Sequence, residues 1–159
     1  MKTKISAGLV LYRFRDGKLE VFLAHPGGPF FARKDLGHWT IPKGEIEPGD
    51  EELPTAIREL KEEVCIEVDP KSQFLDLGTI RQKGGKTVHA WGVAQDLDDS
   101  RTFQSNTFSL EWPPGSGKFQ NFPEVDRAQF FPIAEARKRI KETQIPLLDR
   151  LEALLHPAQ

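Results

Sequence analysis

Runs of hydrophobic residues typical of β-strands occur near the start of this chain and again after residue 70. Apolar runs at residues 5–14 and 19–24 flank Asp16-Gly17, a pair typical of a tight hairpin turn. Further strand-like runs span residues 74–82 and 86–96, and shorter apolar runs span 108–112 and 128–132. The pattern predicts a β-hairpin at the start of the chain and more strands after residue 70.

A helical period separates these two groups of strands. Apolar residues recur at the spacing of one helix face at Leu53, Ala56, Ile57, Leu60 and Val64. Pro54 is tolerated only in the first turn, so we predict a helix from about residue 52 or 53 to Val64. Cys65 then falls where a left-handed residue commonly ends a helix.

The remaining segments favour loops and two closing helices. Residues 25–34, 98–106 and 113–122 are rich in glycine, proline or polar residues and predict loops, and 38–42 is a short extended piece. Residues 133–141 and 146–155 predict helices. With no repeat or linker, strands on both sides of a helix followed by closing helices predict a single domain over 1–159, an α/β sandwich.

Composition narrows the setting of the protein. A net charge of −2 gives no reason to expect stable nucleic-acid binding, and no segment approaches the ~20 apolar residues of a membrane span. The single cysteine excludes an internal disulfide and suits a reducing compartment. The short N-terminal apolar run is interrupted by Arg13, unlike a signal peptide. We expect a cytoplasmic protein, as a monomer or a homodimer.

Three acidic residues lie off the apolar stripe of the predicted helix. Glu59, Glu62 and Glu63 stand at i, i+3 and i+4, so they share one helix face. Like charges at this spacing repel, and a hard divalent cation such as Mg²⁺ would remove that cost. A solvated acidic surface is the alternative.

The residues around these glutamates carry a family resemblance. Gly44 and Asp50 precede the run Arg58-Glu59-Leu60-Lys61-Glu62-Glu63 in fixed register, and Ile66 follows it. The segment 44–66 resembles the Nudix box, the signature of the Nudix hydrolases. Two positions depart from that signature, because Asp50 replaces a glutamate and Cys65 replaces a glycine. The resemblance implies an α/β/α sandwich with a mixed sheet, in which the box forms a loop-helix-loop.

The resemblance also implies a chemistry. Nudix enzymes hydrolyse a phosphoanhydride bond in a nucleoside diphosphate linked to another group, with Mg²⁺ or, as a substitute, Mn²⁺. It assigns Glu59, Glu62, Glu63 and the Gly44 carbonyl as metal ligands. Either Glu59 or Glu63 would also orient or deprotonate water. Family members also place this base on a distant loop, where Glu124 is the candidate.

Arg58 completes the implied catalytic set. We expect it to pair with Asp50 and so hold the loop over the helix. The alternative is a surface ion pair of ~0–1 kcal/mol.

The residues before the box indicate a substrate class. The run His38-Trp39-Thr40-Ile41-Pro42-Lys43-Gly44 resembles that of the asymmetric diadenosine tetraphosphate hydrolases. It implies that His38 and Lys43 contact polyphosphate and that Lys86, before a strand, contacts substrate. Ala90 replaces a tyrosine of that group. The aromatic residues that could stack on adenine instead are Phe30, Phe31 and Trp112.

Several functions remain open at this point. A hydrolase of dinucleoside polyphosphates is favoured, and its partner would be a small nucleotide. The same fold also serves pyrophosphatases of nucleoside triphosphates, nucleotide sugars or ADP-ribose. A Nudix domain that only senses a nucleotide, and a purely structural acidic helix, are the non-enzymatic alternatives.

Overall fold

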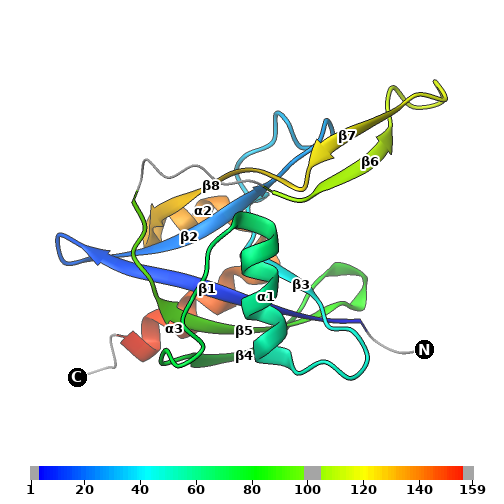
Figure 1. Ribbon diagram of the computed structural model, residues 1–159. Helices are drawn as coiled ribbons and strands as arrows, with labels where there is room; N and C mark the ends of the chain where they lie inside the picture. Colours follow the sequence, from blue (N-terminus) through cyan, green and yellow to red (C-terminus); the bar gives the residue numbers. More distant parts are fainter. Residues whose placement is uncertain (1–3, 99–104, 156–159) are drawn as a thin grey trace.

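A mixed sheet of six strands forms the centre of the molecule (Figure 1). This computed structural model describes residues 4–98 and 105–155. The strand order is β4-β5-β1-β2-β8, with β3 also paired to β1. The strands are β1 (Ile5–Arg15), β2 (Lys18–Pro26), β3 (Lys43–Glu45), β4 (Leu75–Arg81), β5 (Thr87–Ala94) and β8 (Val125–Pro132). A separate antiparallel pair, β6 (Thr107–Glu111) and β7 (Phe119–Pro123), projects from the body as a hairpin.

Helices cover both faces of the sheet, as Figure 1 shows. α1 (Glu52–Val64) covers one face, where Leu60 and Val64 pack with Leu9 and Leu11 of β1. α2 (Ile133–Arg139) and α3 (Ile145–Leu155) belong to the core of the other face. Short 3₁₀ turns at Lys83–Gly85 and Glu142–Gln144 complete the elements. The expected α/β sandwich is confirmed, and none of the described helices is long and apolar enough to cross a membrane.

The N-terminal hairpin follows the predicted pattern. β1 and β2 pair antiparallel up to Arg15 and Lys18, and the turn residues Asp16 and Gly17 both have positive φ. β1 also pairs parallel to β5 along Ile5–Tyr12. Because β1 carries helices on both faces, its residues 7–11 are all buried, which explains their uninterrupted apolar sequence.

α1 also begins and ends where its apolar period predicts. Pro54 lies in the first turn, where its missing N–H breaks no helical hydrogen bond. Cys65 ends the helix with φ 57° and ψ 34°, and its N–H donates to the Lys61 carbonyl at 2.9 Å. The cysteine therefore adopts the left-handed exit that a glycine usually makes, and its presence leaves the course of the chain unchanged.

Two predicted segments differ in the structure. The predicted loop 113–122 is wrong at its end, because Phe119–Pro123 forms β7 and pairs Phe122 with Phe108. The sequence does not predict this strand because the polar residues Gln120 and Asn121 interrupt its apolar pattern. The extended piece 38–42 lies before the paired strand: only Trp39 and Thr40 make isolated bridges there. Most of the predicted loop 98–106 lies outside the described residues.

The loop of residues 27–34 is fixed at both ends. His25, which is fully buried, has Nε2 2.5 Å from the Lys34 carbonyl oxygen and Nδ1 2.7 Å from Asp126 Oδ1. The Gly27 N–H donates to the Glu124 carbonyl at 2.9 Å. A long polar loop is thereby anchored to β2 and to the start of β8.

We expect Cys65→Gly to raise the free energy of unfolding by about 0.5–1 kcal/mol. A left-handed L-residue costs roughly 1–2 kcal/mol, and the extra backbone entropy of glycine offsets part of the gain. Urea unfolding of wild type, Cys65→Gly and a Cys65→Ala control measures it. Equal stability of the glycine and alanine variants would contradict the strain at this position.

Candidate active site

Two glycines allow β3 to lie between β1 and α1. Gly8 of β1 pairs with Lys43, and a Cβ at Gly8 would lie 2.8 Å from the Pro42 carbonyl oxygen. A Cβ at Gly44 would collide with the carboxyl group of Glu59. Side chains at either glycine would separate the strand from its neighbours, so both are required for this close approach.

The three glutamates of the predicted metal set project from α1 near β3. The side chain of Glu59 is 19% exposed and lies against Gly44. Glu63 is partly buried, and its Oε2 accepts a hydrogen bond of 3.2 Å from the Lys43 backbone N–H. Glu62 is more open, at 45% exposure. The structure therefore brings Glu59 and Glu63 to the strand and leaves Glu62 nearer solvent.

Burial makes these carboxyl groups unusually weak acids. It raises the pKa of Glu63 to about 8, although the backbone N–H and the charge of Lys43 act in the opposite direction. Burial and the charge of Glu62 raise the pKa of Glu59. Glu124 raises the pKa of both Glu59 and Glu63. Burial, assisted by neighbouring carboxylates, thus disfavours the ionised forms of Glu59 and Glu63.

Arg58 supplies positive charge at the site. Its guanidinium lies 3.5 Å from Asp50, 3.6 Å from Glu59 and 3.6 Å from Glu62. The expected pair with Asp50 is present, and Arg58 is shared with two glutamates. Among residues 4–98 and 105–155, no three His, Cys, Asp or Glu side chains are grouped so that they could hold a metal ion.

Three lysines, Lys43, Lys86 and Lys141, lie close enough for their charges to act on one another. Burial lowers the pKa of Lys43, and the charges of Lys141 and Lys86 lower it further. Lys141 lies beside the His38–Lys43 segment because its backbone N–H donates to the Trp39 carbonyl at 2.8 Å. Lys141 could not be found from the sequence, because it is far from Lys43 along the chain and belongs to no motif.

A buried glutamine holds the lysine-bearing segments together. Gln144 is fully buried, and its Oε1 accepts a hydrogen bond of 3.0 Å from the Ile41 N–H. Its Nε2 donates to Gln82 Oε1 at 2.9 Å, and the Gln82 N–H donates to the Lys86 carbonyl at 2.7 Å. The segments that carry Lys43, Lys86 and Lys141 are therefore connected by one short chain of hydrogen bonds.

His38 and Glu124 lie on the loops around this centre. The Nδ1 of His38 is 3.0 Å from the Leu36 carbonyl oxygen, and its ring is 6.4 Å from that of Phe31. Glu124 is exposed at the junction of β7 and β8, and its charge acts on both Glu59 and Glu63. The structure thus brings Glu124 to the glutamate side, whereas His38 is bonded only within its own loop among the contacts described.

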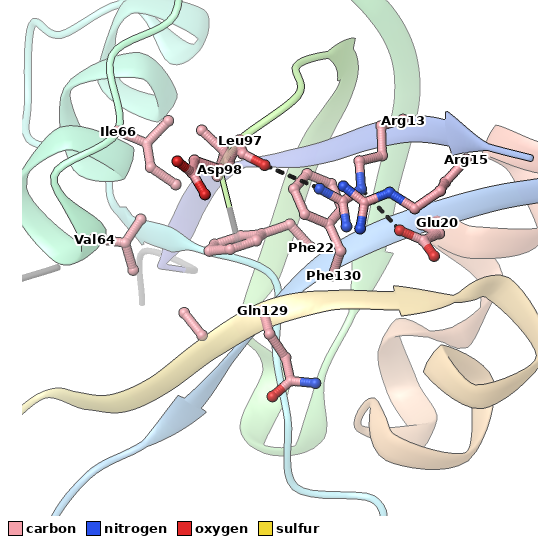
Figure 2. Close-up of a pocket in the computed structure, with 11 residues that line it drawn as sticks. Arg13, Arg15, Glu20, Phe22, Val64, Ile66, Leu97, Asp98, Gln129 and Phe130 are labelled. Atoms are coloured by element: carbon pink, nitrogen blue, oxygen red, sulfur yellow. Dashed lines mark hydrogen bonds and ion pairs between the residues drawn. The ribbon is translucent and has the colours of Figure 1, made fainter. Parts of the chain in front are cut away.

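A separate pocket of about 400 Å³ lies at the C-terminal end of α1, beside Val64 and Ile66 (Figure 2). None of the three glutamates lines it. Arg13 within it is held by Glu20 at 2.8 Å and by the Leu97 carbonyl at 3.1 Å. Its guanidinium lies 4.0 Å from the ring centroid of Phe130. Arg13 of β1 therefore contacts both β2 and β8, which indicates a structural role for this residue.

Comparison with known proteins decides the family. A model of the NUDIX domain matches residues 2–151. The chain belongs to the NUDIX family. The resemblance of residues 44–66 to the Nudix box is therefore confirmed, and with it the mixed-sheet fold that the family implies.

Several proteins similar to this NUDIX chain are named as tetraphosphatases. It is 46% identical over 61 residues to the asymmetrical bis(5′-nucleosyl)-tetraphosphatase of Caenorhabditis elegans, a match that covers 38% of this chain and 40% of that protein. The rat protein of the same name is 39% identical over 67 residues, covering 38% and 44%. The matches thus span under half the length of these relatives.

Solved structures extend the similarity over nearly the whole chain. A binary complex of C. elegans Ap4A hydrolase is 28% identical, with a TM-score of 0.68, and the match covers 94% of this chain and 97% of that one. The NUDIX domain of Shewanella oneidensis NrtR, complexed with ADP ribose, has a TM-score of 0.66 at 18% identity and covers 98% and 90%. The second similarity concerns the fold alone.

We expect Gly44→Ala to lower the free energy of unfolding by about 1–3 kcal/mol, because its methyl group would overlap the Glu59 carboxyl group. The loss should shrink in a Glu59→Ala background, where that carboxyl group is absent. Urea unfolding of the wild type, both single variants and the double variant measures the coupling. Additive effects of the two substitutions would show that the loss of stability in Gly44→Ala does not come from overlap with the Glu59 side chain.

The pKa of Glu63 predicts a pH-dependent stability in chelator-treated protein. An unfolded chain loses this proton near pH 4.5, whereas the folded chain keeps it until about pH 8. Unfolded protein therefore binds fewer protons between these values, and stability falls as the pH rises through them. Glu63→Gln should flatten this fall in thermal unfolding, and a control at exposed Glu67, Glu67→Gln, should not. A wild-type slope in Glu63→Gln would refute the shift.

Proposed function

We propose that this protein is a Mg²⁺-dependent hydrolase of dinucleoside polyphosphates, with diadenosine tetraphosphate as its representative substrate. The observation that carries the proposal is the meeting of two opposite charge groups at β3. Glu63 and Glu59 of α1 lie against Lys43 and Gly44, and the charges of Lys141 and Lys86 act on the side chain of Lys43. Such a site suits a substrate that has both a reacting phosphate and a long anionic chain.

The glutamates fit a hard divalent cation by their chemistry. Carboxylate oxygens are the ligands that Mg²⁺ prefers, and burial raises the pKa of Glu63, so that a bound cation would stabilise its ionised form. Glu59, Glu62 and Glu63 would hold the ion together with the Gly44 carbonyl, and to do so their side chains, which are not grouped for a metal among the described residues, would have to turn toward it. When bound, Mg²⁺ or Mn²⁺ supplies charge neutralisation at the phosphates and makes a bound water more acidic.

The chain itself would orient the water and the substrate. Glu59, Glu63 and the exposed Glu124 are the groups that could take a proton from water, and burial, assisted by neighbouring carboxylates, raises the pKa of Glu59 and Glu63. Arg58 would keep Asp50 and the loop before α1 in place. Lys43, Lys86 and Lys141 would bind successive phosphates as point charges, with His38 as a further donor.

The similar proteins support an enzyme and this substrate class. Asymmetrical tetraphosphatases are among the relatives by sequence, and an Ap4A hydrolase matches nearly the whole chain by structure. ADP-ribose is the alternative substrate, because a NUDIX domain bound to it has a comparable fold. A sensing domain is disfavoured because all three glutamates are present. We place this activity in the cytoplasm, where the exposed thiol of Cys65 would stay reduced.

Purified protein with Mg²⁺ should convert diadenosine tetraphosphate to ATP and AMP, with a higher kcat/KM than for ADP-ribose. Glu62→Gln should lower kcat more than about 100-fold, because a charge at the metal is lost. Mass spectrometry of the products and initial rates for both substrates measure this.

Glu67→Gln is the matched control, since Glu67 is an exposed acid just after α1 and pairs with Lys61. It should retain the wild-type rate. A preference for ADP-ribose would overturn the substrate class and leave the metal site intact. Unchanged kcat in Glu62→Gln, or full activity with chelator present, would overturn the metal site.

A further inference from the structure

The hairpin β6–β7, residues 107–123, begins beside the glutamate helix; we refer to it as the arm. The Glu124 N–H donates to the Asn106 carbonyl at 2.7 Å and closes its base. Ser105 and Asn106 share a groove of about 520 Å³ with Arg58, Lys61 and Glu62 of α1. From there the arm projects away from the body (Figure 1). Whatever binds along the arm therefore continues outward from the candidate active site.

One face of the arm is aromatic and meets the loop 27–34. Phe108 and Phe122 are directly paired, with rings 6.0 Å apart, and Trp112 follows at the same alternation. Gly28 of the loop lies so close that a Cβ there would be 2.9 Å from the Phe108 ring. Phe119, 67% exposed, pairs with Glu111 and so belongs to the opposite face.

Phe30 is the residue that this packing leaves open. Its ring meets Trp112 edge-on, with centroids 5.4 Å apart and planes at 85°, yet the residue remains 55% exposed. The neighbouring Phe31 faces His38, with centroids 6.4 Å apart. Two consecutive phenylalanines therefore lie between His38 and Trp112, which is near the tip of the arm.

We propose that the exposed ring of Phe30, braced by Trp112, is the stacking platform for the base of the second nucleoside, at the far end of the polyphosphate. This inference rests on the proposed function. Trp112 lies five residues beyond Thr107, which is roughly 16 Å along the strand. We expect the base next to the cleaved phosphate to stay near the glutamates and not to reach Phe30 and Trp112. The base at the other end of the tetraphosphate would be far enough from the glutamates to reach them.

The platform selects two-ended substrates without reading a particular base. Every nucleobase has a π-face, so stacking on Phe30 tolerates adenine and guanine alike. A one-ended substrate such as adenosine 5′-tetraphosphate offers the same phosphates to the lysines but no second base. The ratio of kcat/KM for diadenosine tetraphosphate to that for adenosine 5′-tetraphosphate therefore isolates the contribution of the platform.

In the test, Phe30→Ala and Phe30→Leu should each lower this ratio about 10-fold, mainly through KM, as expected for one lost base stack. Phe30→Tyr should restore it, because it keeps the aromatic face. Phe119→Ala, an exposed phenylalanine on the other face of the arm, should leave the ratio at the wild-type value.

Each contrary result has a distinct meaning. Equal losses on both substrates would show that Phe30 only supports the loop, and a wild-type ratio in Phe30→Leu would show that packing suffices. Either result overturns the platform while the hydrolase stands. If the wild type cleaves neither tetraphosphate, the proposed function fails, and the platform fails with it.

Discussion

The fit of Gly44 against Glu59 is the constraint on which the candidate site depends. β3 is only three residues long, and it must lie next to β1 while its middle residue touches the side chain of a helix. Only glycine at this position, with Gly8 opposite Lys43, leaves room for both contacts. The carboxyl groups of α1 and the lysine of β3 are held together because the backbone between them carries no side chain.

At this site several charged groups have neighbours of like charge as well as of opposite charge. Glu63 contacts the backbone of Lys43, while the side chain of Lys43 is influenced more by Lys141 than by that glutamate. Like charges therefore remain near one another among the glutamates and among the lysines. Their repulsion lowers the free energy of unfolding, and binding of a ligand that carries both a cation and a polyphosphate would raise it again.

The sequence predicted those parts of the structure that depend on local spacing. The apolar period located α1 within a residue, and Asp16-Gly17 located the first hairpin. The fixed register of the box placed Arg58 near Asp50. The sequence could not reveal that Lys141 lies near Lys43 or that Trp112 contacts Phe30. In each pair the two residues are about 80 to 100 positions apart in the sequence and are brought together only by the fold. The strand β7 was missed because its pairing partner, rather than its own composition, stabilises it.

The loop 27–34 is anchored at one end by the contact of His25 with the Lys34 carbonyl and at the other by the Gly27–Glu124 hydrogen bond, and these anchors separate two kinds of sequence change. Residues at its ends are tied to β2 and β8, so substitutions there disturb the core. Between the anchors, the rings of Phe30 and Phe31 contact Trp112 and His38, and the backbone of Phe31 is hydrogen-bonded within the loop. Under the role proposed for Phe30, substitutions of its ring would alter the choice of ligand without changing any residue of the glutamate helix.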